Sequence, residues 1–192
     1  MDKVSPVVTA APRSAVYVSF VAAINDQSVT TLIRTMSELV NQGASEIHLL
    51  FSSGGGSVGL GFALYNTLNA LPIKLVTYNV GNVDSIANVV FLSGEERYAA
   101  SSATFMFHGV TWGAPNPITG QQAREAVANI GADEARIAAV IAERTNLPQS
   151  DVELFFREAA TKDAQYALEH GFIQEIRNAA IPSGAPIVAL TY

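Results

Sequence analysis

Ser85 is the first residue of this 192-residue chain whose surroundings suggest covalent chemistry. It follows an apolar strand and a glycine, Gly81, and opens an apolar helix that we predict to run through Leu92. Such a strand-to-helix turn presents a hydroxyl at the carboxyl end of the strand, and it directs backbone N–H groups to the same place. A nucleophile needs this setting, although a serine that only caps the helix has the same pattern.

His108 is the residue best placed to serve as a base for such a nucleophile. Of the three histidines, His48 lies inside a predicted strand and His170 lies just before a glycine that ends a helix. His108 instead ends the apolar strand Ala103–Phe107 and precedes a glycine, and open α/β sheets hold their sites at strand ends of this kind. The alternative is a core histidine whose ring is satisfied by structural hydrogen bonds.

The third group is the run Gly54–Gly56, between a predicted strand and a predicted helix. Glycine lets the backbone approach a ligand closely, so the run suits a phosphate cradle or an oxyanion-binding turn, besides a plain flexible turn. Gly54, Gly56 and Gly59 satisfy the dinucleotide pattern literally, but the next strand ends at Tyr78 without the acidic residue that a ribose requires. An oxyanion turn, a nucleophile and a base therefore follow neighbouring strands.

The elements that must position these residues alternate between strands and helices. The predicted strands are Ala15–Ala22, Glu46–Ser52, Ile73–Tyr78, Ala103–Phe107 and Phe172–Ile176. The predicted helices are Ser28–Asn41, Leu60–Ala70, the helix after a turn at Gly81–Ser85, Gln121–Arg144, a short helix capped by Ser150, and Ala164–His170, which Gly171 ends. Alternation of this kind predicts an α/β fold with right-handed crossovers and a mainly parallel sheet, in one domain over residues 1–192 with a flexible segment at 1–14.

Composition excludes several classes of function. Seventeen acidic against eleven basic residues, without a basic cluster, argue against a nucleic-acid partner. The absence of cysteine excludes disulfides and thiolate metal sites, and we expect no cofactor or metal. The N-terminal residues lack the apolar run of a signal peptide, and no stretch reaches about 18 apolar residues, so we expect a cytoplasmic protein without a membrane partner.

In order and spacing, these segments resemble the proteolytic subunit of the caseinolytic (Clp) protease family, within the Clp/crotonase superfamily. Ser53–Val58 is similar to the family's Ser-Pro-Gly-Gly-Ser-Val turn, and Gly81–Ala87 to its Gly-x-Ala-Ser-Met-Gly segment, with one additional residue. Met106–His108 matches the family's Met-x-His strand end, and Tyr166–Ile173 matches Glu-Ala-x-x-x-Gly-Leu-Ile. The resemblance covers about Val16–Ile176 and marks this chain as a divergent member.

The resemblance implies a spiral of ββα units with a mainly parallel sheet and a protruding handle helix, here Gln121–Arg144. It also implies that Ser85 is the nucleophile of a serine-type endopeptidase, that His108 is its general base, and that the N–H groups of Gly55 and Ile86 form the oxyanion hole. Peptides or unfolded proteins would be the substrates. A homo-oligomeric ring is implied, with an ATPase chaperone as a possible partner; the half-apolar composition agrees with buried subunit contacts or with a buried parallel sheet.

This sequence departs from the family at the third catalytic position, where a gap-free alignment from Gly171 places Ala159 instead of aspartate. Glu158 or Asp163 could orient His108 instead. Because Asp163 is also a good N-cap for the last helix, we favour Glu158. The incomplete triad leaves two alternatives open, a non-catalytic ring subunit and a crotonase-like acyl-CoA enzyme that uses the same kind of oxyanion hole.

A second departure lies beside the nucleophile itself. Asp84 stands where the family has a small residue, and Ala87 stands where it has a glycine. A carboxylate next to the reacting serine would disfavour an oxyanion there and favour a protonated His108. Both differences point to weak, conditional or lost activity.

Overall fold

The computed structural model describes residues 15–113 and 117–192, so the predicted flexible segment 1–14 lies outside the described residues. The strands are β1 Val16–Val21, β2 Glu46–Ser53, β3 Lys74–Asp84, β4 Glu96–Ala99, β5 Thr104–Met106, β6 Thr161–Asp163, β7 Glu175–Ile176 and β8 Ile187–Ala189. The helices are α1 Asp26–Asn41, α2 Val58–Ala70, α3 Ala87–Phe91, α4 Gly120–Arg144, α5 Gln149–Glu158 and α6 Ala164–Glu169.

These strands form one mixed sheet in the order β6-β5-β3-β2-β1-β8; beside this path, β4 pairs with β3, and β7 pairs with β4. Every described pairing is parallel except that of β5 with β6. The predicted α/β class with a mainly parallel sheet is therefore confirmed. The right-handed crossovers of such a sheet explain why helices follow the strands and cover it.

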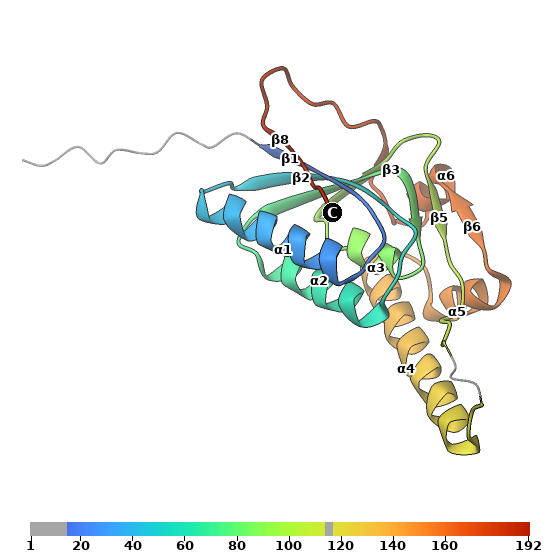
Figure 1. Ribbon diagram of the computed structural model, residues 1–192. Coiled ribbons are helices and arrows are strands. Elements are labelled where there is room, and N and C mark those ends of the chain that lie inside the picture. The colour runs from blue at the N-terminus through green and yellow to red at the C-terminus, as the bar shows by residue number, and fades with distance from the viewer. Residues whose placement is uncertain (1–14, 114–116) are drawn as a thin grey trace, which may run out of the picture.

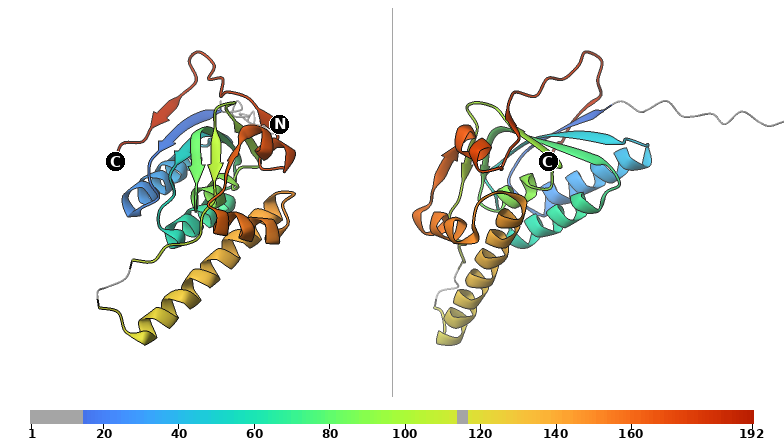
Figure 2. Two further views of the ribbon diagram at one scale, coloured as in Figure 1. Left: turned by 90° about the vertical axis from the view of Figure 1, so that its right-hand side faces the viewer. Right: turned by 180° about the vertical axis from the view of Figure 1, so that it is seen from behind.

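Helices α1, α2 and α3 lie together on one face of the sheet, and the segment between β7 and β8 arches over the other face (Figures 1 and 2). Alternate residues of β2 are buried, and Ile47, Leu49 and Phe51 join the main hydrophobic core. Helix α4 extends away from this body, as predicted for the long helix (Figure 1). Its buried residues, Ala126 apart, lie in its second half: Ile137, Ala138 and Ile141.

Several details of the prediction were wrong, among them the following. Gly81–Asp84, expected as a turn, continues β3, because these residues pair with β5 after the first part of β3 has paired with β4. Strand β4 was not expected at all, since its sequence Glu-Arg-Tyr-Ala is short and half charged. Ser150 lies within α5 and does not cap it; Pro148 holds the N-cap position, where its fixed φ suits the entry to a helix.

The guanidinium of Arg97 is a buried cation that holds three segments together through hydrogen bonds to their carbonyl oxygens: the turn before β4, the end of α4 and the turn after α6. It donates to the carbonyl oxygens of Phe172, Gly94, Gly171 and Arg144 at 2.8, 3.0, 3.1 and 3.3 Å. Burial lowers the pKa of Arg97 to about 10, so the group stays charged at neutral pH. Arg144 ends α4 and Gly171 follows α6, so the cation lies where helix dipoles favour positive charge.

We expect Arg97→Met to lower the free energy of unfolding by about 3 kcal/mol or more, because each buried carbonyl left without a donor costs about 1–3 kcal/mol. Urea unfolding followed by circular dichroism measures the change. The control is Arg34→Ala, which removes an exposed ion pair with Glu38 at 4.0 Å and should cost at most about 0.5 kcal/mol. Equal losses in the two variants would contradict the role assigned to Arg97.

Candidate active site

The end of β3 and the end of β5 lie side by side, and this pairing brings Ser85 and His108 together. Asp84 pairs with Met106, the last residues of β3 and β5. The backbone N–H of Ser85 then donates to the Met106 carbonyl oxygen at 2.8 Å. His108 follows Met106 by two residues, so both candidate residues emerge at the carboxyl ends of adjacent parallel strands. Figure 1 shows these two strands, β3 and β5.

Ser85 and His108 line one cavity together with the glycine turn after β2. The cavity has a volume of about 230 Å³ and is lined by Gly54, Gly56, Val58, Ser85, His108, Val110 and Thr111. The three groups that the sequence singled out therefore meet in space. The aliphatic and hydroxyl side chains from the two neighbouring segments complete the wall.

The backbone of Ser85 has φ 58°, in the left-handed region that non-glycine residues seldom adopt. Such strain costs on the order of 1–3 kcal/mol and persists where the surroundings impose it, often at functional sites. Ser85 is not the side-chain cap of α3: the N-cap is Ile86, and no side chain caps this helix. The helix-capping interpretation of Ser85 is thus wrong.

Gly55 makes room for this turn. Its own φ is 84°, and a Cβ built there would lie 2.7 Å from the Cβ of Ser85, closer than real side chains approach. The N–H of Gly55 donates to Ser53 Oγ at 3.1 Å. Gly56 lines the cavity, and among the described residues the N–H groups of Gly56 and Ile86 have no protein acceptor. Gly56, just before the N-cap Ser57, and Ile86, which follows Ser85, therefore supply two donors near the serine; within the glycine turn the resemblance had implied Gly55 as the donor.

Asn88 is a second residue that sequence reasoning missed. It is fully buried, and its Nδ2 donates to the carbonyl oxygens of Ser85 at 3.1 Å and Met106 at 2.9 Å. Its Oδ1 has no hydrogen-bond partner among the residues that the structure describes. Asn88 thus ties the serine turn to the strand that ends at His108. The available signal was a polar residue in the otherwise apolar segment Ile86–Leu92.

The imidazole of His108 contacts a backbone carbonyl: Nδ1 lies 2.7 Å from the Gly109 oxygen. A carbonyl oxygen only accepts, so a hydrogen bond at this position requires the proton on Nδ1, and in the neutral ring Nε2 is then the acceptor. No carboxylate in the described part of the chain lies within 4.0 Å of the His108 ring nitrogens. Glu158 is exposed at the end of α5, and Asp163 caps α6 by accepting from the Tyr166 N–H at 2.8 Å. The structure brings neither carboxylate into a hydrogen bond with His108.

The other two histidines have structural partners. His48 Nδ1 lies 3.2 Å from the Tyr78 hydroxyl, and its Nε2 lies 3.0 Å from Glu46. His170 stacks on Tyr166, with its Nδ1 2.9 Å from the Tyr166 carbonyl oxygen. The Asp84 carboxylate beside Ser85 accepts a hydrogen bond from the Asn82 side chain.

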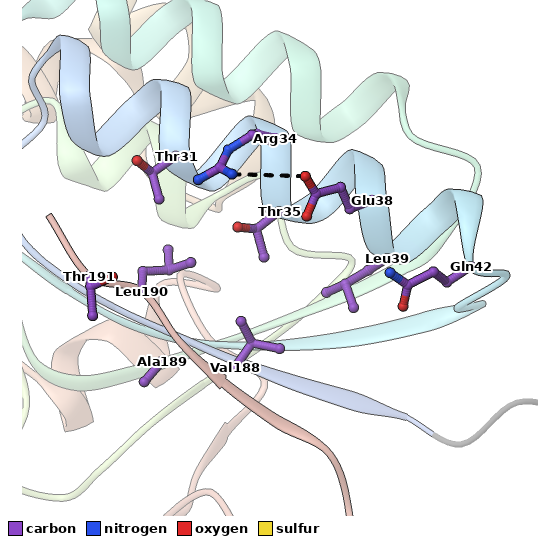
Figure 3. A pocket seen from close by; sticks show the side chains of 10 residues that line it. All are labelled: Thr31, Arg34, Thr35, Glu38, Leu39, Gln42, Val188, Ala189, Leu190 and Thr191. Carbon is purple, nitrogen blue, oxygen red and sulfur yellow. Dashed lines mark ion pairs between the residues drawn. The ribbon is translucent and has the colours of Figure 1, made fainter.

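A separate hollow of about 340 Å³ lies between α1 and the C-terminal segment (Figure 3). Its rim carries the Arg34–Glu38 ion pair, and Thr31 and Thr35 project from the same helix. Strand β8 pairs with β1 and lines the other wall of the hollow, so the C-terminal residues Ile187–Ala189 form an edge strand of the sheet. Among the described residues that line this hollow there is neither a histidine nor a serine.

The family model described as Clp protease matches residues 8–180 of the chain. The match contains the cavity and every residue placed around it. The chain belongs to the Clp protease family. Membership supports a peptidase of the Clp type, and Clp proteases generally form oligomeric rings that act on peptides. None of the helices described here for this Clp family member has both the length and the apolar character needed to cross a bilayer.

In this Clp family member, α2 supports the serine turn by close packing. A Cβ at Gly61 would lie 2.3 Å from the Ile86 side chain, whereas one at Gly59, on the same helix, would meet nothing within 4 Å. Gly61→Ala should therefore displace Ile86 and destabilise the protein by about 1–3 kcal/mol. Gly59→Ala should instead stabilise it by about 0.5–1 kcal/mol. Thermal unfolding compares the two variants, and a Gly61→Ala protein as stable as the wild type would refute this account.

Proposed function

We propose that this Clp family member is a serine-type endopeptidase that cleaves peptide bonds inside a ring-shaped oligomer, with Ser85 as nucleophile and His108 as general base. The observation that carries the proposal is the shared cavity, in which a strained Ser85 and the His108 ring lie beside two unengaged backbone donors. A structural serine has no need of left-handed backbone, nor of a histidine at the same cavity. Convergence of all these groups supports covalent catalysis.

In this mechanism Nε2 of His108 accepts the proton of the Ser85 hydroxyl as the oxygen attacks the peptide carbonyl. The N–H groups of Gly56 and Ile86 stabilise the oxyanion that forms; that of Gly55 would join them only after leaving Ser53 Oγ. The protonated His108 then gives its proton to the leaving amine. Water, activated by the same ring, hydrolyses the acyl-enzyme and regenerates the serine.

The substrate side of the proposal rests on the family and on the shape of the cavity. A volume of about 230 Å³ between Val58 and Val110 admits a side chain and a short stretch of backbone, not a folded protein. Peptides or unfolded chains therefore fit the site, and delivery by an ATPase partner is compatible with this. The protruding α4, with Val127 72% exposed, supplies an apolar surface for contacts between ring subunits.

A non-catalytic ring subunit is the second candidate, and one observation favours it: His108 lacks a carboxylate partner within hydrogen-bond distance in the described residues. A crotonase-like acyl-CoA enzyme uses a comparable oxyanion hole, but the Ser85–His108 cavity would have no role in it. Measuring the hydrolysis of fluorogenic peptides and the turnover of acyl-CoA distinguishes the peptidase from the acyl-CoA enzyme.

A fluorophosphonate probe, followed by peptide mass spectrometry, tests the nucleophile directly. We expect an adduct on Ser85 in the wild-type protein and a loss of labelling of at least about 100-fold in Ser85→Ala and His108→Ala, because the nucleophile and its base act as a unit. Ser101→Ala, which removes an exposed serine, is the control and should label like the wild type. Absence of labelling in a correctly assembled protein would refute the peptidase and favour the non-catalytic subunit.

A further inference from the structure

The peptide unit between Gly109 and Val110 lies between the candidate base and a carboxylate from the long helix. On its carbonyl side, the Gly109 oxygen is 2.7 Å from Nδ1 of His108. On its amide side, the Val110 N–H donates to Oε1 of Glu134 at 2.9 Å. Glu134 belongs to α4 and lies 24 residues further along the chain than Val110. Imidazole, peptide and carboxylate therefore form one continuous chain of hydrogen bonds.

The backbone on either side of this peptide is held in place. The Phe107 N–H donates to the Ala160 carbonyl oxygen at 2.8 Å, and the Gly109 N–H donates to that of Phe156 at 3.0 Å. The carboxylate also packs closely, since a Cβ at Gly109 would lie only 2.9 Å from Oε1 of Glu134. The direction of the Gly109 carbonyl is thus set from two sides, by α5 and by Glu134.

The charge of Glu134 is available to this peptide. Glu134 is partly buried, and in the part of the chain that the structure describes no lysine or arginine lies within 4.0 Å of its carboxylate. The nearby Arg136 pairs with Asp133 at 2.8 Å instead. A hydrogen bond to an ionised carboxylate is roughly twice as strong as a neutral one, and hydrogen bonds in series polarise each other.

We propose that Glu134 is a positioning residue that takes the part of the absent triad acid and acts on His108 through the Gly109–Val110 peptide. By polarising this peptide, the carboxylate makes the Gly109 oxygen a stronger acceptor for the Nδ1–H of His108. That bond holds the ring in the tautomer whose Nε2 has a free lone pair and can act as a base, which is the task of a triad acid. The link to catalysis rests on the proposed peptidase function, whereas the effect on the ring does not.

The tautomer of His108 tests the proposal without any enzymatic activity. We would record ring ¹⁵N–¹H spectra of the protein labelled with ¹⁵N-histidine, with His108→Ala to assign the signals. His108 should show a protonated Nδ1 in the wild type and a mixture of tautomers in Glu134→Ala. His170 is an internal control, because its Nδ1 also contacts a carbonyl, that of Tyr166, and its signals should not change.

Labelling kinetics at Ser85 connect the tautomer to reactivity. Glu134→Ala should slow labelling by the fluorophosphonate roughly tenfold, a small share of the about 10⁴-fold that a direct triad acid contributes. Glu134→Gln keeps an acceptor for the Val110 N–H but removes the charge. Its labelling rate should therefore lie between that of the wild type and that of Glu134→Ala. In Gly109→Ala the new Cβ displaces the Glu134 carboxylate, so this variant should show the same slower labelling as Glu134→Ala. It therefore tests the proposal even if Glu134→Ala folds poorly. Exposed Glu143, on the same helix, supplies the control Glu143→Ala.

Several results would overturn the proposal. An unprotonated Nδ1 in the wild type, or an unchanged His108 tautomer in both Glu134→Ala and Gly109→Ala, contradicts it directly. The proposal is also contradicted if Glu158→Ala labels slowly at Ser85 while Glu134→Ala labels at the rate of the wild type. That result would assign the positioning role to Glu158. If the wild type does not label at Ser85, the peptidase function fails, and the NMR result still decides whether Glu134 positions His108.

Discussion

The parallel pairing of the last part of β3 with β5 is the interaction on which the site depends. β3 first pairs with β4 and then, over Asn82–Asp84, with β5, so two strands share one side of it. The hydrogen bond from Ser85 N–H to Met106 closes the ladder at the point where the serine leaves it. Because parallel strands end at the same edge of a sheet, the residues following β3 and β5 must face each other.

Holding the serine at that edge has a cost in local stability. Ser85 adopts a left-handed backbone, Asn88 buries an oxygen that has no partner among the described residues, and only a glycine fits at position 55 beside Ser85. Each of these features is less stable than the arrangement usual in a protein core. The surrounding apolar residues, with Val89, Val90 and Phe91 fully buried, supply the packing that tolerates these costs.

The elements were predictable where local pattern decides them. The amphipathic α1 begins one turn after β1 with a capping box between Asn25 and Ser28, and Gly171 ends α6 with φ 74°. Prediction failed where a neighbouring strand decides. Gly81 and Asn82 resemble a turn in isolation, yet they extend β3 because β5 offers a hydrogen-bonding partner that the local sequence does not reveal.

The sequence by itself determined the α/β class, the membership that its motifs indicated, and the meeting of Ser85, His108 and the glycine turn, because strand ends in a parallel sheet leave little choice of place. It did not determine which groups contact them. Gly56 rather than Gly55 lines the cavity, Asn88 binds the serine turn, and Glu134 rather than Glu158 connects to the His108 segment. Only the tertiary structure decided these points, because such contacts depend on how α4 and α5 pack beside β5, and residue spacing carries no record of that packing.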